Sequence, residues 1–574
     1  MTKHRDESEQ GLALPLPNVA LGTLSALALA ACGAGEGGTP NSEAQAQASG
    51  GKVATSEDEQ AAVRFLDQAG LGATTAEVKA LTDSGLNFNA WLDAQFAMVP
   101  VTSAWQIASD LGIGKLDQNK DGIPDLIGSD FGLDNALWYR LFKSPDVLRQ
   151  RIVLALSEIF VVSIRNMPIP WGQFACLAYW DILESGCFGT FRELIERITL
   201  SPAMGVYLSM RGSQKADPVS GRRPDENYAR ELLQLFTIGL KELDDNGMPT
   251  ANDTYTNEDV MALSRVLTGW DFDVATPPAY VKDQTPDFTR LPMKPHSELH
   301  DEDDKTFLGL TIKGKANDAV GDLEQALDHI CDHHNVPFFF SRQLIQRLVM
   351  SNPTPDYVMR VAAKFKDNGQ GVRGDLKAVI RAVLTDPTAR DVLTGLAAVQ
   401  RSKLREPMLR FVQWGRLARL QSTDNLWSIG DLSAASRLAQ SPMRSPSVFN
   451  FFRPGYVPLN SGVSADGFVA PEFQITDESS VVGYANFMWN HMDGAPAQAM
   501  SVDYSEWTAI ATDATKLVDR LNLMLSARAM SSVTVERITK AIDAMKKDTS
   551  ARLANRVKAA FYLILVSPDY MVQR

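Results

Sequence analysis

The chain has 574 residues, of which 45% are hydrophobic and 22% are charged, an ordinary composition for a globular protein. A single hydrophobic core stops growing near about 250–300 residues, so we expect two lobes or more. The net charge of -13 argues against a nucleic-acid partner, because binding to phosphates requires a basic surface.

The N-terminal segment, residues 1–31, has the pattern of a bacterial lipoprotein signal peptide. Lys3, His4 and Arg5 give a basic start, although the acidic Asp6, Glu7 and Glu9 follow. An uncharged, mostly apolar run over residues 12–31 comes next and leads into Leu29-Ala30-Ala31-Cys32. The pattern predicts cleavage before Cys32 and lipid on the new N-terminal cysteine. The alternatives are an ordinary cleaved signal peptide and an uncleaved anchor. We therefore expect a protein of the cell envelope, periplasmic or surface-facing, that is held to a membrane through lipid on Cys32.

Residues 32–57 are small, polar and rich in glycine, which predicts a flexible tether after the lipidated cysteine. Helical periodicity then dominates, because apolar residues recur at steps of three and four. The predicted helical segments are 58–69, 75–82, 87–97, 146–162, 190–200, 227–240, 256–268, 320–333, 337–349, 355–367, 373–385, 389–418, 507–527, 532–547 and 549–566.

The predicted fold class is mainly α, a compact multi-lobed helical body with long irregular loops and few short strands. Residues 306–312 are the clearest strand-like stretch, and Thr256 with Asp259 has the pattern of a capping box. Residues 270–318 form a long polar loop between helical blocks, and loops of this length are often functional. We expect residues 58–574 to form one domain whose two helical lobes join around this loop.

Cysteine usage leaves two questions open. Cys176 and Cys187 are close in sequence, and in an exported protein they either form a disulfide or remain free thiols. Cys331 has no obvious partner, so we expect a buried thiol there rather than a nucleophile.

The segment LDQNKDGIPD, residues 116–125, has the spacing of a calcium-binding loop. The candidate ligands are Asp117, Asn119, Asp121, the carbonyl oxygen of Ile123, and Asp125. The twelfth position is Gly128 rather than Glu, so the loop is not a complete EF-hand, and Asp130 is a further candidate ligand. We expect a structural Ca²⁺ here, and a solvated Asp/Asn/Gly turn is the alternative.

Two pairs of histidines stand four residues apart, His296 with His300 and His329 with His333. Two imidazoles at this spacing share one face of a helix and can bind a transition metal. The first pair lies in a loop, where the spacing has no fixed geometry, and His333 can equally brace a helix end. A transition-metal site and a purely structural role both remain open.

The segment DENYARELLQLFTIGL, residues 225–240, is an amphipathic helix with an unusual polar face. That face carries Glu226, Asn227, Arg230, Glu231 and Gln234. It is either a solvated surface or the lining of a polar cleft that supplies a general base or a metal-binding carboxylate. No nucleophile elbow, phosphate-binding loop, dinucleotide fingerprint or Cys-x-x-Cys pair occurs in the chain, so the commonest named enzyme classes are not indicated.

Several stretches along the chain are long and specific: AVRFLDQAGLGAT (62–74), LRQRIVLALSEIFVVS (148–163), PDENYARELLQLFTIGL (224–240), YTNEDVMALSRVLTGW (255–270), HDEDDKTFLG (300–309), HHNVPFFFSRQLIQRLVMSNP (333–353), GVRGDLKAVIRAVLTDPTAR (371–390), KLREPMLR (403–410), SPSVFNFFRPGY (445–456) and LVSPDYMVQR (565–574). Through these stretches the chain resembles, over roughly residues 60–574, a bacterial family known as "domain of unknown function 1800".

The resemblance implies a secreted or surface-associated, mainly helical protein, and it implies no particular reaction. It also implies an exported partner of a second family of unknown function, "1501", which is similar to sulfatases and alkaline phosphatases. The polar positions that match the family are Glu226, Asn227, Arg230, Glu231, Trp270, His300, Asp301, Lys305, His333, Asn335 and Arg453. His334 departs from the pattern, which has proline there, and His296 and His329 lie outside it.

Two functional hypotheses follow. In the first, the protein is a hydrolase or metal-dependent enzyme acting on an extracytoplasmic polymer or on its partner. Its candidate catalytic residues are Glu226, Arg230, Glu231, His300, Asp301 and His333. Glu231 would then be a general base or ligand, the two histidines ligands or acid/base groups, and Arg230 the site for an anionic group. In the second, the protein is a lipid-tethered binding or scaffold module without catalysis.

Overall fold

The computed structural model describes residues 54–574, except residues 101, 116, 118–123, 275–284 and 393–394. The predicted signal peptide, Cys32 and nearly all of the tether lie outside the described residues. Contacts within the chain group Val53–Arg574 as one unit, and the division of this unit into two lobes stays a prediction. None of the described helices has the length and apolar composition needed to cross a membrane.

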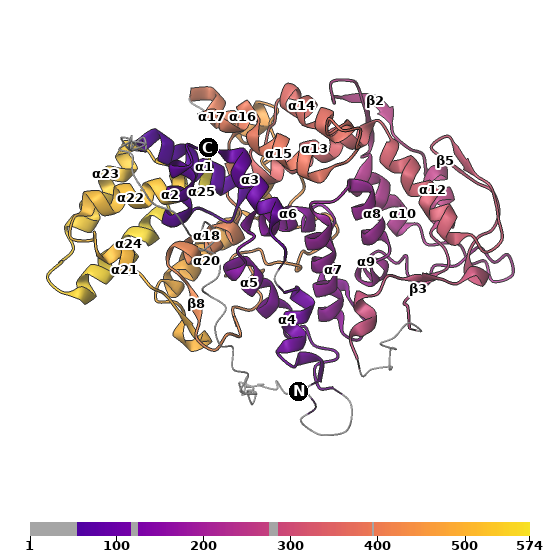
Figure 1. Ribbon diagram of the computed structural model, residues 1–574, viewed down its shortest axis with the longest axis horizontal. Coiled ribbons are helices and arrows are strands. Elements are labelled where there is room, and N and C mark those ends of the chain that lie inside the picture. Colours follow the sequence, from indigo (N-terminus) through magenta and orange to yellow (C-terminus); the bar gives the residue numbers. More distant parts are fainter. Residues whose placement is uncertain (1–53, 101, 116, 118–123, 275–284, 393–394) are drawn as a thin grey trace, which may run out of the picture. The chain divides into compact units, whose positions relative to one another are not determined.

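The prediction of a mainly α fold is confirmed (Figure 1). The first helices are α1 (Ser56–Ala69), α2 (Thr75–Asp83), α3 (Phe88–Ala97), α4 (Ala104–Asp110), α5 (Leu133–Lys143), α6 (Val147–Ser157), α7 (Gly172–Gly186), α8 (Phe191–Thr199) and α9 (Pro202–Tyr207). The middle of the chain forms α10 (Asn227–Glu231), α11 (Asn257–Val266), α12 (Ala319–Asp332), α13 (Asn335–Leu348), α14 (Pro355–Lys366), α15 (Leu376–Thr385), α16 (Pro387–Arg390) and α17 (Gly395–Arg401). The last helices are α18 (Pro407–Leu417), α19 (Gly462–Ala465), α20 (Glu478–His491), α21 (Ser505–Thr508), α22 (Ala514–Ser526), α23 (Ser532–Asp543), α24 (Ser550–Leu565) and α25 (Pro568–Met571).

The strands of the described residues pair only two at a time, and every pair is antiparallel. The pairs are β1 (Lys241–Leu243) with β2 (Pro249–Asp253), β3 (Trp270–Asp271) with β4 (Lys294–Pro295), β5 (Lys305–Phe307) with β6 (Leu310–Ile312), β7 (Lys403–Leu404) with β10 (Val572–Gln573), and β8 (Gln421–Ser422) with β9 (Met500–Ser501). The strand-like stretch 306–312 is thus a tight hairpin, with Lys305 opposite Ile312. The long loop 270–318 contains no α-helix among its described residues.

Local sequence signals explain several helix starts. The capping box predicted at Thr256 is present: its hydroxyl accepts from the Asp259 backbone N–H, and the Asp259 carboxylate accepts from the Thr256 N–H at 2.8 Å. Thr55 and Asp58 form the same reciprocal cap on α1. These caps satisfy backbone N–H groups that have no partner within the helix.

Three predicted helices are wrong in extent. The segment 507–527 is broken after α21 and resumes as a helix only at Ala514, the start of α22. The segment 389–418 is not one helix but contains α17, β7 and α18, and Pro407 begins α18 at its first turn, where proline is favoured. The segment 146–162 ends as a helix at Ser157, and its apolar residues beyond that point are buried in non-helical backbone. The buried helix α7 has no polar face over Phe174–Trp180, so it lacks the periodicity by which amphipathic helices are found.

Cys176, Cys187 and Cys331 are free and buried. Cys176 and Cys187 therefore form no disulfide, and the prediction of a buried thiol at Cys331 is confirmed. Burial raises the pKa of each thiol to about 12, so none of them is a ready nucleophile.

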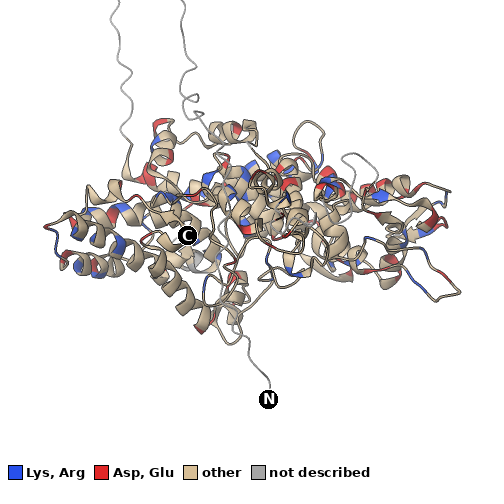
Figure 2. Ribbon diagram, turned by 90° about the horizontal axis from the view of Figure 1, so that it is seen from below, with Lys and Arg blue, Asp and Glu red and all other residues tan. Residues whose placement is uncertain are grey.

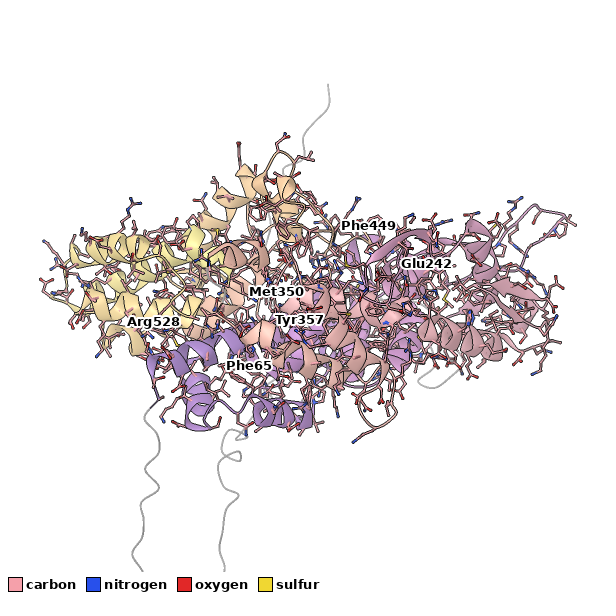
Figure 3. The ribbon with its side chains drawn as sticks, turned by 90° about the horizontal axis from the view of Figure 1, so that it is seen from above. Phe65, Glu242, Met350, Tyr357, Phe449 and Arg528 are labelled. Carbon is pink, nitrogen blue, oxygen red and sulfur yellow. The ribbon has the colours of Figure 1, made fainter. Side chains whose placement is uncertain are left out.

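Segments far apart in the sequence pack together. Helix α1 lies beside α22, where Arg520 forms an ion pair with Glu59 at 2.7 Å (Figure 1). Tyr357 of α14 is fully buried, and its hydroxyl donates to the carbonyl oxygen of Val383 on α15 at 2.6 Å (Figure 3). Acidic and basic residues are interspersed along the drawn helices (Figure 2).

A buried ionic cluster joins segments from across the chain. Its members are Arg151 of α6, Glu158 after α6, Arg347 of α13, Lys403 of β7, Glu406 before α18, and Glu472 of the 3₁₀ turn Pro471–Ile475. Each of these side chains is at most 5% exposed.

Direct contacts hold this cluster together. Arg347 pairs with Glu158 at 3.0 Å, and the Lys403 ammonium lies 3.2 Å from Glu472 and 3.5 Å from Glu406. The amide of Gln440 donates to both Glu158 and Glu406, at 3.1 and 2.9 Å. Burial and the charge of Glu406 raise the pKa of Glu158 well above its usual range. Burial also opposes ionisation of Glu406, but Lys403 and the arginines outweigh it and lower the pKa of that carboxyl. These opposite shifts favour the proton on Glu158 and the negative charge on Glu406.

We expect the two glutamates to respond differently to the same substitution. Glu406→Gln should lower the free energy of unfolding by about 3–5 kcal/mol, because it leaves buried cations without their carboxylate. Glu158→Gln should cost less than about 1 kcal/mol, because an amide resembles the neutral carboxyl already present. Urea unfolding of the two variants at neutral pH measures both values, and equal losses would contradict this assignment of the proton.

Candidate functional site

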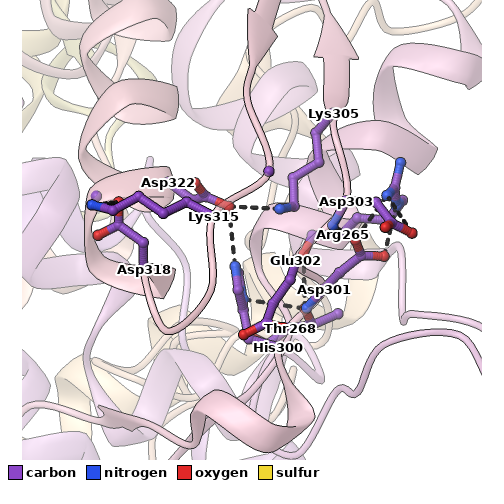
Figure 4. A network of polar contacts seen from close by, with 12 residues as sticks. Arg265, Thr268, His300, Asp301, Glu302, Asp303, Lys305, Lys315, Asp318 and Asp322 are labelled. Atoms are coloured by element: carbon purple, nitrogen blue, oxygen red, sulfur yellow. Dashed lines mark hydrogen bonds and ion pairs between the residues drawn. The ribbon is translucent and has the colours of Figure 1, made fainter.

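His300 lies at the centre of a buried polar network in the 270–318 loop (Figure 4). Its side chain is 0% exposed. The ring Nδ1 lies 2.9 Å from the carbonyl oxygen of Thr268, and Nε2 lies 3.1 Å from a carboxylate oxygen of Asp322. The same oxygen of Asp322 accepts from the Lys305 ammonium at 2.6 Å. Both ring nitrogens of His300 are therefore engaged by protein atoms.

The elements around this network position each group. Asp322 lies in the first turn of α12, where the helix dipole favours a carboxylate. Thr268 follows α11, and Lys305 begins β5. Gly269 has a φ of +85°, and a Cβ there would lie 2.9 Å from the carbonyl oxygen of His296 and 3.0 Å from the backbone nitrogen of His300. Only glycine allows the chain to pass this closely beneath the histidine.

Asp301, next to His300, faces a different partner. Its two carboxylate oxygens each accept from Arg265 of α11 at 2.7 Å, a bidentate pair. Burial opposes ionisation of Asp301, but the hydrogen bonds and charge of Arg265 outweigh it and lower the pKa of the carboxyl. Asp301 thus anchors the loop to α11.

The predicted helix over 225–240 changes from an α-helix to a π-helix in its middle. α10 ends at Glu231, and a π-helix follows over Leu232–Thr237. Glu226 and Arg230 form an ion pair at 3.0 Å with both side chains more than one-third exposed, which contributes little to stability. Because a π-turn inserts an extra residue, the polar face does not continue in register beyond Glu231.

Glu231 differs from the other polar residues of this face, Glu226, Asn227, Arg230 and Gln234, because it is buried. It is 8% exposed, and its Oε2 atom has no hydrogen-bond partner among the residues that the structure describes. Burial raises the pKa of this carboxyl against the opposing charge of Arg230. An unsatisfied buried carboxyl next to a π-helix is unusual, since such groups are normally paired and π-turns often mark functional positions.

His333 is half-buried at the junction between α12 and α13. Its Nδ1 accepts from the backbone N–H of Asn335 at 3.1 Å, so it braces the start of α13. Burial lowers its pKa, and His334 and His329 act in the same direction. α12 ends at Asp332, so His329 and His333 do not lie on one continuous helix, and the Nε2 atom of His329 lies 2.9 Å from the carbonyl oxygen of Leu308.

The structure brings some candidates together and leaves others with separate partners. Glu226 meets Arg230, whereas Glu231, His300 and His333 each contact different groups. Over the described part of the chain, no group of three or more His, Cys, Asp or Glu side chains is placed to hold a metal ion.

Most of the calcium loop lies outside the described residues. Asn119, Asp121 and Ile123 belong to the undescribed segment 118–123, and Asp117 and Asp125 flank it. Asp130, the further candidate, pairs with Arg444 at 2.8 Å. The Ca²⁺ site stays a prediction.

Residues that complete the His300 network were not singled out from the sequence. Asp322, Arg265 and Thr268 hold the two loop residues in place. Asp322 had a readable signal, since it lies on the apolar face of α12 beside Leu323 and Ala326, where a carboxylate needs a buried partner.

The fold and these contacts define a mainly helical protein whose most buried histidine belongs to a closed polar network. A family model described as "protein of unknown function (DUF1800)" matches residues 64–572. The chain belongs to this family, as the resemblance in its motifs predicts. Neither the search of curated proteins nor that of solved structures found a match.

We expect His300→Ala to lower the free energy of unfolding by about 2–4 kcal/mol, because it leaves a cavity and removes two buried hydrogen bonds. His296→Ala is the matched control: this residue is exposed in the same loop, and its loss should change stability by less than about 0.5 kcal/mol. Thermal and urea unfolding of both variants measure the difference. A His300→Ala variant as stable as the control would contradict a structural role.

Proposed function

We propose that this protein is an exported lipoprotein, anchored through Cys32, that serves in the cell envelope as a binding or scaffold module for an exported partner. The anchoring rests on the Leu29-Ala30-Ala31-Cys32 sequence and the apolar run before it. The partner we propose is a member of the "1501" family. A structural Ca²⁺ bound by the Asp117–Asp125 loop is part of the same proposal.

The network around His300 is the observation that favours a binding module over an enzyme. A general acid or base must reach its substrate within hydrogen-bond distance, directly or through one water. His300 is fully buried, and both of its ring nitrogens already face Thr268 and Asp322. Asp301 is likewise held by Arg265. These side chains fix the loop, which supports a role for this region as a rigid surface rather than a reaction centre.

One observation favours an enzyme as a second candidate. Glu231 is a buried carboxyl with a raised pKa and an unsatisfied oxygen, which are properties of a general acid or base. In this alternative the protein is a hydrolase or metal-dependent enzyme that acts on an extracytoplasmic polymer or on its partner, with Glu231 as the reactive group.

Lipidation of Cys32 gives the first test. In a bacterial host, the complete chain should incorporate radiolabelled palmitate and sediment with membranes. Cys32→Ala should abolish the label, because the thiol that carries the lipid is gone. Cys331→Ala is the control, since it removes a buried thiol and should keep both label and membrane association. An unlabelled wild-type chain would contradict the lipoprotein assignment.

A second test separates the two candidates. The mature chain is mixed with a purified "1501"-family protein from the same organism, and the mixture is followed by size-exclusion chromatography and intact-mass spectrometry. A scaffold should form a stoichiometric complex and leave the partner's mass unchanged, and Glu231→Gln should bind equally well. An enzyme that acts on the partner should change its mass, and Glu231→Gln should abolish that change. Absence of a complex and of any mass change would contradict the proposed partner.

A further inference from the structure

A small pocket lies beside the 403–410 stretch, away from the His300 network. It is formed by β7, the start of α18, the 3₁₀ turn Pro471–Ile475 and the first turns of α20. Its walls are largely apolar, with Leu404, Leu438, Ile475 and Met571 among them, and Arg410 also lines it. The volume is about 30 Å³.

Arg410 is the chemically informative residue of this pocket. It is 5% exposed, and its buried Nε atom finds no hydrogen-bond partner in the described part of the chain. Its guanidinium lies 4.2 Å from the ring centre of Tyr484, a contact that attracts the charge weakly compared with a carboxylate. Within the described residues Arg410 forms no ion pair, whereas Arg405 in the same stretch pairs with Asp67 at 2.9 Å.

A buried guanidinium without an anion is costly, because the charge has lost its hydration. An anion that entered the pocket would meet this charge between apolar walls, where electrostatic attraction is stronger than in water. One water molecule needs about 10–15 Å³ of cavity volume, so 30 Å³ suits a carboxylate with at most a short alkyl group. Arginine binds planar carboxylates with two parallel hydrogen bonds.

We propose that this pocket binds a carboxylate group through Arg410. The carboxylate comes either from a free short-chain acid or from the C-terminus of a peptide chain, and both present the same planar anion. Among the residues that line the pocket, Val481 of α20 is the most exposed, at 46%. The inference stands on Arg410 and its pocket and does not depend on the proposed function.

Calorimetric titration of the mature chain with sodium acetate, sodium propionate and the tripeptide acetyl-Ala-Ala-Ala tests the proposal, against sodium chloride at equal ionic strength. A saturable signal is expected for at least one of the carboxylates. Tighter binding of the tripeptide acid than of acetate, together with loss of binding by its C-terminal amide, would assign the site to a chain end. Equal or tighter binding of acetate or propionate would assign it to a free acid.

Matched variants on α20 test whether the carboxylate binds in this pocket. Val481→Phe puts a larger side chain on the pocket wall and should weaken binding by about tenfold or more, a loss of about 1.4 kcal/mol. Val482→Phe is the control, because Val482 is 60% exposed and does not line the pocket, and its affinity should stay within about twofold. Arg410→Met should abolish binding.

Two results would overturn the proposal. One is the absence of saturable binding of any probe up to about 100 mM, which corresponds to an affinity too weak for a built site. The other is equal binding by the Val481→Phe and Val482→Phe variants, which would show that the carboxylate binds elsewhere. Because both valines are exposed, these variants keep the test decisive even if Arg410→Met does not fold.

Discussion

The buried ionic cluster around Glu158 and Glu406 is the constraint on which the rest of the fold depends. It takes charged groups from α6, α13, β7, the start of α18 and the turn Pro471–Ile475, and Gln440 bridges its two central carboxylates. Ions inside a protein are tolerated only when their partners are in place, so these segments must assemble in one arrangement. The C-terminal strand β10 pairs with β7 beside the cluster, and the amide of Gln573 donates to the carbonyl oxygens of Leu348 and Val349 at 3.1 Å. The last strand therefore packs against the same buried interior to which α6 contributes.

Buried polar groups of the interior differ in how completely they are hydrogen-bonded. In the His300 network both ring nitrogens are paired, although Oδ1 of Asp322 has no hydrogen-bond partner within the described residues. Together with the Asp301–Arg265 pair, this network holds a loop with no α-helix in a defined position between α11 and α12. Glu231 and Arg410 are buried groups that retain an unsatisfied atom. A polar atom left unpaired inside a protein costs stability. Glu231 and Arg410 are therefore better candidates for a functional contact than His300, whose two ring nitrogens are both paired.

The sequence predicts the helical class and most amphipathic helices because burial of one face imposes a period of about 3.6 residues. It fails where burial is complete, as in α7, since a helix covered on all sides has no polar stripe to read. It also fails at 389–418, where helical periodicity hides the break before Pro407. The spacing of the apolar residues does not indicate the π-helix after Glu231. The partners of His300, Asp322 and Thr268, lie 22 and 32 residues away in the sequence. The residue types of the His300 network could therefore be recognised in the sequence. The pairing of their atoms could not, because it depends on distances in the folded chain.

The KLREPMLR stretch shows why a family match alone does not separate stability from binding. Lys403 and Glu406 enter the ionic cluster, and Arg405 pairs with Asp67 and donates to the carbonyl oxygen of Tyr570 at 3.0 Å. Arg410, one turn into α18, instead faces an apolar pocket without an ion pair from the described residues. All four charges look equivalent in the sequence, because each falls in the same short motif. Lys403, Arg405 and Glu406 have partners for their buried charges, and they stabilise the fold. Arg410 is buried without an ion pair. A ligand that neutralises this charge at the pocket between α18 and α20 therefore has most to gain.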